Sequence, residues 1–309
     1  QGEQYWMGEN PPYGAAITYW LKDGLKSKRQ IRQDASKQAE KDKKQAGYPS
    51  PAELTAEADE EAPQILLTIS DAAGKVVKRL NGPTGKGIHR IHWNLRGPAA
   101  TAGEGGGRRF AGDDAPAASF DAGGAFVNPG VYKVALAKRV SGVITPLPGE
   151  QAFTVEMDPA AQIDEGGRKA AADFQARALK MQRALAGAME QANGARTRID
   201  AIRRALVDSP ADAKLMDQAS SLATRLTAIL RVMRGDETLR GLESGSPSSI
   251  SSRINSAGYG SRSALGRPTG TMEANLRIAG EEFAVEQPKL KALLDELKRF
   301  EQAVDAAGA

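Results

Sequence analysis

The sequence contains no cysteine, only two histidines and few aromatic residues. Without cysteine the chain cannot form disulfides, thiolate nucleophiles or zinc sites with cysteine ligands. Phe, Trp and Tyr together make up 5% of the residues, so the cores must consist mainly of aliphatic side chains. No run approaches the ~18 apolar residues of a membrane span, and the first residues lack the layout of a signal peptide. We therefore expect a chain without a membrane span, soluble or peripheral to a membrane complex.

The charge is nearly balanced. The 42 basic and 38 acidic residues give a formal net charge of +4, and neither half of the chain concentrates positive charge. This argues against a nucleic-acid partner, which needs a strong positive field. The length of 309 residues suffices for two domains, each with its own core. Because the sequence begins with Gln1, we expect a processed product or a fragment of a longer protein.

The strongest strand signal lies in residues 63–95. Its first part has apolar residues at every second position, Ile65, Leu67 and Ile69, as in a strand with one buried face. A turn and two further strands complete a predicted three-stranded β-meander, in which Trp93 is the natural core anchor. The second and third strands are expected at residues 75–80 and 88–95.

Further strand signals occur on both sides of this stretch, at residues 15–21, 130–137 and 151–157. Six or seven short strands separated by turn residues predict an immunoglobulin-like or fibronectin-like β-sandwich. Residues 97–128 are rich in Gly and Ala without a sustained period, which indicates a long surface loop.

A charged stretch interrupts the strands at residues 25–62. Residues 26–44 contain eight basic and three acidic side chains, whereas residues 53–61 contain five acidic and no basic ones. The pattern predicts a solvated helical insertion whose opposite charges fold it back on itself.

After about residue 165 the apolar period changes from two to between three and four, which predicts helices. One long helix precedes a second that starts near Ser209 and Pro210, with Ser as N-cap. Pro288 should kink or divide a third helical section. The fold class is therefore α+β, an immunoglobulin-like (fibronectin-like) β-sandwich followed by an α-helical hairpin or small bundle. The expected organisation is residues 1–24 as an N-terminal segment with the first sandwich strand, 25–62 as the charged insertion, 63–158 as the sandwich with its loop at 97–128, and 159–309 as the hairpin or bundle with a Ser/Gly-rich loop at 241–270.

The titratable residues do not form a catalytic pattern. His89 and His92 are three apart on a predicted strand, so they point to opposite faces and cannot readily share a metal. Adjacent carboxylates at 113–114 and 281–282 do not make the separated pair that a glycosidase needs. The serines of residues 244–263 lack a nucleophile elbow, which leaves a mobile loop or a strap over a partner. We predict no catalytic, cofactor-binding or metal site.

Exposed aromatic and basic residues are the remaining candidates for a functional surface. The N-terminal aromatics pack into a core or between domains, or they form a platform that stacks on a ligand. The candidate interaction surface comprises Tyr5, Trp6, Tyr13, Trp20, Arg108, Arg109, Phe110 and Tyr259.

Several segments together resemble the C-terminal region of bacterial sortilin-type β-propeller proteins, also called glycosyl-hydrolase-like or BNR-repeat proteins. The matching segments are GENPPYGAAITYWLKD, ILLTISDAAGKVVKRL, GIHRIHWNLRGP, PGVYKVAL with its DP exit, and GRPTGTMEANL. The resemblance implies a small sandwich like that of the flagellar hook-capping protein and a terminal helical hairpin. The sequence contains no propeller, so functions that the family places in propeller blades cannot be carried over.

These observations predict a non-enzymatic structural or protein–protein interaction module. We expect an accessory subunit of a larger bacterial envelope-associated assembly, periplasmic or secreted, whose partners are other protein subunits. An alternative is a carbohydrate-binding accessory domain of a secreted glycosyl-hydrolase-like protein. A third possibility is a role at the membrane periphery through residues 26–44.

Overall fold

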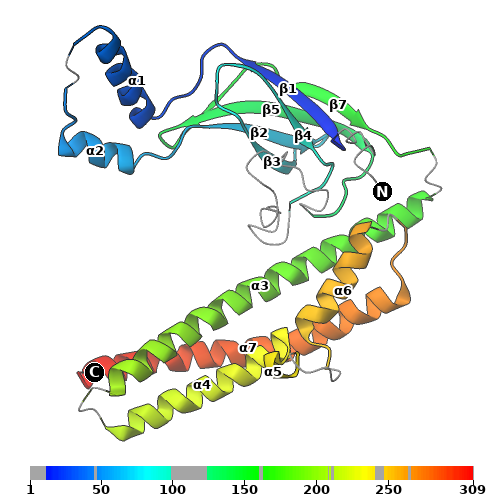
Figure 1. Cartoon of the computed structure of the whole chain (residues 1–309). Coiled ribbons are helices and arrows are strands. Elements are labelled where there is room, and N and C mark those ends of the chain that lie inside the picture. The colour runs from blue at the N-terminus through cyan, green and yellow to red at the C-terminus, as the bar shows by residue number, and fades with distance from the viewer. Residues whose placement is uncertain are drawn as a thin grey trace, which may run out of the picture. The chain divides into compact units, whose positions relative to one another are not determined.

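The computed structural model divides the chain into two compact units, residues 1–98 with 105–161 and residues 99–104 with 162–309. The first unit contains strands and two short helices, and the second is helical (Figure 1). The chain is thus of mixed α and β content, with antiparallel sheets and a long helical C-terminal region. The structure describes residues 12–44, 47–98, 124–159, 163–207, 209, 212–240, 247–263 and 266–308, without the side chains of 240, 259, 262 and 263.

Two antiparallel sheets make up most of the first unit. One sheet pairs β1 with β4, and in the other β2 lies between β3 and β5, while β6 and β7 both pair with β5 on its other side. The strands are β1 (Ala15–Leu21), β2 (Gln64–Asp71), β3 (Val76–Gly82), β4 (Gly87–Trp93), β5 (Gly130–Val140), β6 (Val143–Pro146) and β7 (Gln151–Val155).

The predicted three-stranded meander is wrong in its last strand. β2 and β3 form the expected hairpin, but β4 crosses to the other sheet, where Ile91 pairs with Ile17 of β1. The alternation in the sequence predicts which face of β4 is buried, but it does not predict which strand β4 pairs with. The crossing places Trp93 opposite the buried face of β2, so the residue reaches the core from the second sheet.

The inner faces of the two sheets share one hydrophobic core. Ile65, Leu67 and Ile69 of β2 are fully buried, as their alternation predicts. Trp93 is also fully buried, and its ring packs edge-on against Tyr132 at 5.5 Å between ring centroids. Its indole N–H donates to the carbonyl of Arg96 at 2.9 Å, so the one polar atom of the ring has a partner inside the core.

The ends of the predicted loop at 97–128 are tied together beside this core. Residues 99–123 lie outside the described residues, but Arg96 and Phe126 form a β-bridge. The guanidinium of Arg96 also stacks on the Phe126 ring, with its carbon 3.8 Å from the centroid.

Two helices occupy the charged stretch, α1 (Lys28–Lys41) and α2 (Pro51–Ala58), and neither has a buried residue. Each begins with a capping box, at Ser27 and Ser50, which satisfies its first free N–H groups. Arg32 of α1 donates two hydrogen bonds to the carboxylate of Glu57 in α2, at 2.6 and 2.9 Å. The opposite charges thus hold the two helices together.

The second unit contains α3 (Glu165–Val207), α4 (Ala213–Arg234), α5 (Glu237–Arg240), α6 (Ile250–Ser263) and α7 (Gly270–Ala306). The helices α3, α4, α6 and α7 lie side by side (Figure 1), and their apolar stripes meet in a common core. Leu185 and Ile199 of α3, Leu226 of α4 and Leu297 of α7 are buried in this core. Aliphatic burial therefore holds the unit together.

Two expectations about the helices are wrong, and a third is wrong in one of its two alternatives. The second helix begins at Ala213 with Asp212 as N-cap, because the Asp212 carboxylate accepts from the N–H of Lys214. The predicted loop at 241–270 contains α6, whose Ile250 and Ile254 are buried against the other helices. The helix was not predicted because most of its residues are small or polar and few of them are apolar. α7 runs through Pro288 as one helix, so the alternative that Pro288 divides the section is wrong, whereas a kink there stays a prediction.

The burial of Trp93 can be tested by truncation. Trp93→Ala should lower the free energy of unfolding of the first unit by about 3 to 5 kcal/mol, because it leaves a large cavity in a close-packed core. The measurement is native-state hydrogen exchange of the β2 amides. Trp20→Ala removes the same ring from an exposed position and should change that free energy by less than about 0.5 kcal/mol. Equal effects of the two variants would contradict the assignment.

The pairing of α1 with α2 should depend on pH. Hydrogen bonds from Arg32 hold the pKa of Glu57 below its usual value, so the contact stabilises the pair above the ordinary pKa of Glu and is lost as pH falls through the lowered pKa. NMR titration of the Glu57 carboxyl carbon should give a midpoint below that of an ordinary Glu, and Arg32→Gln should raise it. An unchanged midpoint in Arg32→Gln would count against the ion pair.

Candidate functional site

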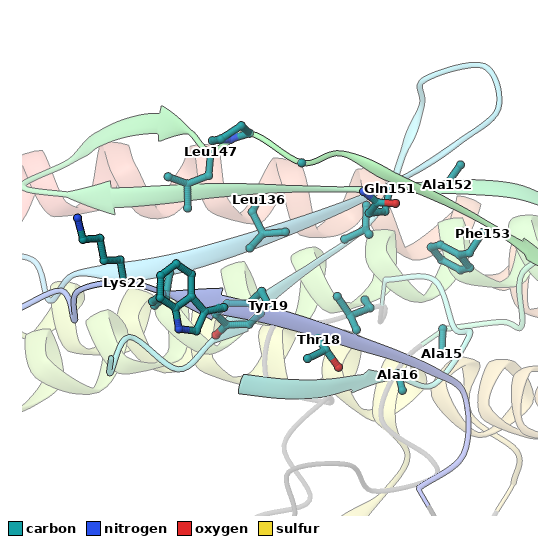
Figure 2. A pocket seen from close by; sticks show the side chains of 16 residues that line it. Ala15, Ala16, Thr18, Tyr19, Lys22, Leu136, Leu147, Gln151, Ala152 and Phe153 are labelled. Atoms are coloured by element: carbon teal, nitrogen blue, oxygen red, sulfur yellow. The ribbon is translucent and has the colours of Figure 1, made fainter. Parts of the chain in front are cut away.

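A groove of about 800 Å³ runs along β1 in the first unit (Figure 2). One wall is the whole of β1, and the other is made by β5, β7 and the connection between β6 and β7. The groove is therefore the gap between the edge of one sheet and the edge of the other.

Side chains from both faces of β1 line the groove. Ile17, Tyr19 and Leu21 point inward and are buried, whereas Thr18 and Trp20 point outward and are exposed. Side chains of both sets line the groove because it follows the edge of the strand and not one face. The edge itself is open: among the described strands, β1 pairs with β4 alone.

The opposite wall is apolar. Leu136 of β5, Leu147 after β6 and Phe153 of β7 extend toward β1 in Figure 2. All three pack against the core of the unit and remain only partly buried. A ligand in the groove would therefore cover apolar surface that the fold leaves partly in water.

A pair of large apolar side chains lies next to the groove on the outer face of the small sheet. Trp20 of β1 and Ile88 of β4 are direct cross-strand partners. They are 63% and 75% exposed, although each is large enough to anchor a core. Because Trp20 also lines the groove, the pair and the groove form one continuous apolar surface.

Tyr19 lies where β1 meets the turn after β3. Its hydroxyl donates to the carbonyl of Pro83 at 2.6 Å, and its ring lies 5.3 Å from that of His89. Burial raises the pKa of Tyr19 to about 12. Gly82 contacts the Tyr19 hydroxyl so closely that a Cβ there would overlap it, which explains the glycine at the end of β3.

Lys22 lies at the end of the groove opposite Ala15, as Figure 2 shows. The structure gives its ammonium group no ion pair with any carboxylate of the described residues. Glu150, which lies between the lining residues Gly149 and Gln151, pairs with Lys133 at 3.2 Å. The groove thus ends at a lysine that has no ion pair within the described ranges.

Of the predicted interaction residues, the structure places two on the surface of the first unit. Trp20 lines the groove, and Tyr13 is 48% exposed with its ring edge-on against Phe126. The six residues between them run mostly as extended strand, on the order of 20 Å, so the two rings do not form one stacking platform. Tyr5, Trp6, Arg108, Arg109 and Phe110 lie outside the described residues, as does the side chain of Tyr259 in α6.

The candidate acids and bases are placed apart. His89 has its Nε2 2.7 Å from the carbonyl of Gly85, and Nδ1 of His92 is buried without a hydrogen-bond partner in the described part of the chain. Glu281 pairs with Arg277 and Glu282 with Arg253, while residues 113–114 are not described. No group of three potential metal ligands occurs within the described ranges. No helix among them has the length and apolarity to cross a bilayer.

Sequence reasoning missed the groove, because it requires knowing which two strand edges face each other. One signal was present. Residues 15–21, AAITYWL, contain no charge, Pro or Gly, although strands at sheet edges usually carry such protection.

No family model, curated protein or solved structure matches the chain. Function must therefore be inferred from the geometry of the site.

Tyr19→Phe tests the packing beside the groove. The folded state keeps the phenol protonated to about pH 12, whereas the unfolded chain ionises it near pH 10. The contribution of Tyr19 is present below the unfolded pKa and is lost as pH rises through the folded one. Urea unfolding should show Tyr19→Phe less stable by about 1 kcal/mol at pH 8, with the difference shrinking toward pH 12. A difference independent of pH would contradict the burial of this hydroxyl.

Proposed function

We propose that this chain is a non-enzymatic protein–protein interaction module, an accessory subunit that docks on other proteins through the first unit. The observation that carries the proposal is the continuous apolar surface formed by the groove along β1 and the exposed pair Trp20 and Ile88. Surfaces of this kind on otherwise charged proteins are typical of sites that a partner covers.

The chemistry of the surface favours a protein partner. Apolar and aromatic side chains gain most from burial at the centre of an interface, where Trp is among the strongest contributors. The walls of the groove carry Leu, Phe and Ile side chains, with a single lysine at its end. A partner with complementary apolar side chains fits these walls better than a sugar, whose hydroxyl groups need polar partners.

We also infer that the first unit is an immunoglobulin-like β-sandwich and that the second is a helical hairpin or small bundle. Two antiparallel sheets with a common core support an immunoglobulin-like β-sandwich, and the packed helices support a hairpin or small bundle as the second unit. The order of the sequence segments supports kinship with the C-terminal region of bacterial sortilin-type proteins. By that kinship we place the chain in the periplasm or outside the cell, in an assembly associated with the bacterial envelope.

The proposal is tested by native mass measurement. The tagged chain is extracted under mild conditions from its source cells, and the mass of the species that contains it is determined. We expect a complex larger than the free chain. Replacing Trp20 and Ile88 by Ser together should weaken the complex at least about tenfold, because anchors of this size usually contribute 2 kcal/mol or more.

A matched double variant provides the control. Val143 and Ile144 of β6 are also exposed, at 65% and 58%, but lie outside the groove lining. Replacing both by Ser should leave the complex intact. Recovery of the free monomer alone under mild extraction would overturn the proposed function.

A further inference from the structure

We propose that β1 is an acceptor for strand addition. A separate protein inserts an extended segment into the groove, pairs its backbone with the open edge of β1, and places a carboxylate beside Lys22. This inference rests on the proposed function and names the partner: an extended segment, apolar at alternate positions, with an acidic group at one end.

The edge of β1 differs from the other free edges among the described strands. β3 carries Lys78 and Arg79 and has a register irregularity against β2, while β6 and β7 are only four and five residues long. The free edge of β4 carries two histidines and an arginine. Charges, irregular pairing and short length are the devices that keep strand edges from pairing. β1 has seven residues in unbroken register with β4 and none of these devices.

The groove matches one strand in length and chemistry. Seven residues of β1 span about 23 Å at ~3.3 Å per residue, so a partner strand of about seven residues would pair along its whole length. Alternate side chains of that strand would point between the sheets, onto Leu136, Leu147 and Phe153. Main-chain hydrogen bonds then supply affinity, and the alternate side chains supply specificity.

The positive charge of Lys22 at one end of the groove indicates where the partner segment carries its acidic group. Lys22 lines the groove and has no ion pair among the described residues. A partner with an acidic side chain or terminal carboxylate at that end gains an ion pair, and a basic group there is repelled. The opposite end, at Ala15, Ala152 and Phe153, has no charged side chain in its lining.

The chain's own segments outside the described residues are poor candidates for the occupant. Residues 1–11 and 99–123 contain no Val or Ile, and residues 99–123 are rich in Gly and Ala. Neither offers the alternation of β-branched or large apolar residues that favours a strand packed on an apolar surface. A partner protein is therefore the occupant that the chemistry favours.

The test uses synthetic peptides with the full chain. The probe is a labelled peptide of about seven residues that alternates Val and Thr and ends in Asp, and its affinity is measured by fluorescence anisotropy. Two isomers are N-methylated at odd or at even positions, so each loses the N–H donors of one edge. Strand addition predicts that one isomer binds at least about tenfold more weakly than the probe, while the other stays within about threefold. Equal affinity of the two isomers, or no binding by the probe, would overturn the inference.

Protein variants locate the binding site. Ala152→Trp fills the groove from an exposed position and should abolish binding, whereas Val143→Trp adds the same ring to β6 outside the groove and should not. Lys22→Glu should weaken binding of the probe that ends in Asp about two- to fivefold, as expected for loss of an exposed ion pair. A peptide that ends in Lys should bind the Lys22→Glu variant with the original affinity, because the ion pair is then formed with reversed charges. Lys75→Glu, in an exposed turn, is the charge control. Circular dichroism and thermal unfolding confirm that each variant is folded.

Two other occupants are outcomes of the same test. If the chain forms a dimer that Ala152→Trp dissociates, the occupant is a second copy. If removal of residues 1–11 raises probe affinity more than about tenfold, the occupant is the chain's own N-terminal segment. Either result overturns the assignment to a separate protein. The proposed function itself survives if the native complex is lost in the Trp20 and Ile88 double variant yet is unaffected by Ala152→Trp.

Discussion

The first unit depends on the burial of Trp93 between two sheets whose described strands share no backbone hydrogen-bond ladder. β4 belongs to the small sheet, yet its indole packs against Tyr132 and Phe153 of the large one. Because these contacts are side-chain contacts, the small sheet is held mainly by the hydrophobic effect. Its strand β1 can therefore lie at the edge of the core with one side open.

That arrangement explains why a groove exists at all. In the described part of the chain the large sheet has five strands and the small one has two, so these two strands cannot cover the whole inner face of the large sheet. The uncovered part holds Leu136, Leu147 and Phe153, which contact the core without full burial. The same imbalance leaves the backbone of β1 open, so an apolar wall and a free strand edge lie side by side.

Local features of the fold were readable from the sequence, and long-range pairings were not. The alternation of Ile65, Leu67 and Ile69 identified a buried face because the side-chain period of a strand is a local property. The partner of β4 was mispredicted because neighbours in a sheet are decided by the core as a whole. α6 was missed because its apolar face has few residues, among them Ile250 and Ile254, in a stretch dominated by Ser and Gly. At the site, Trp20 was among the candidate interaction residues, but the groove beside it could be recognised only from the arrangement of the two sheets.

The charged helices α1 and α2 form a segment that can change in evolution without changing the core. They leave the sheets after β1 and return before β2, they contribute no buried residue, and each carries its own capping box. Their fold is thus specified locally and by ion pairs such as that of Arg32 with Glu57. Such a segment can be exchanged, lengthened or deleted between related proteins while the core stays the same, so this excursion is where lineages of the fold are free to diverge.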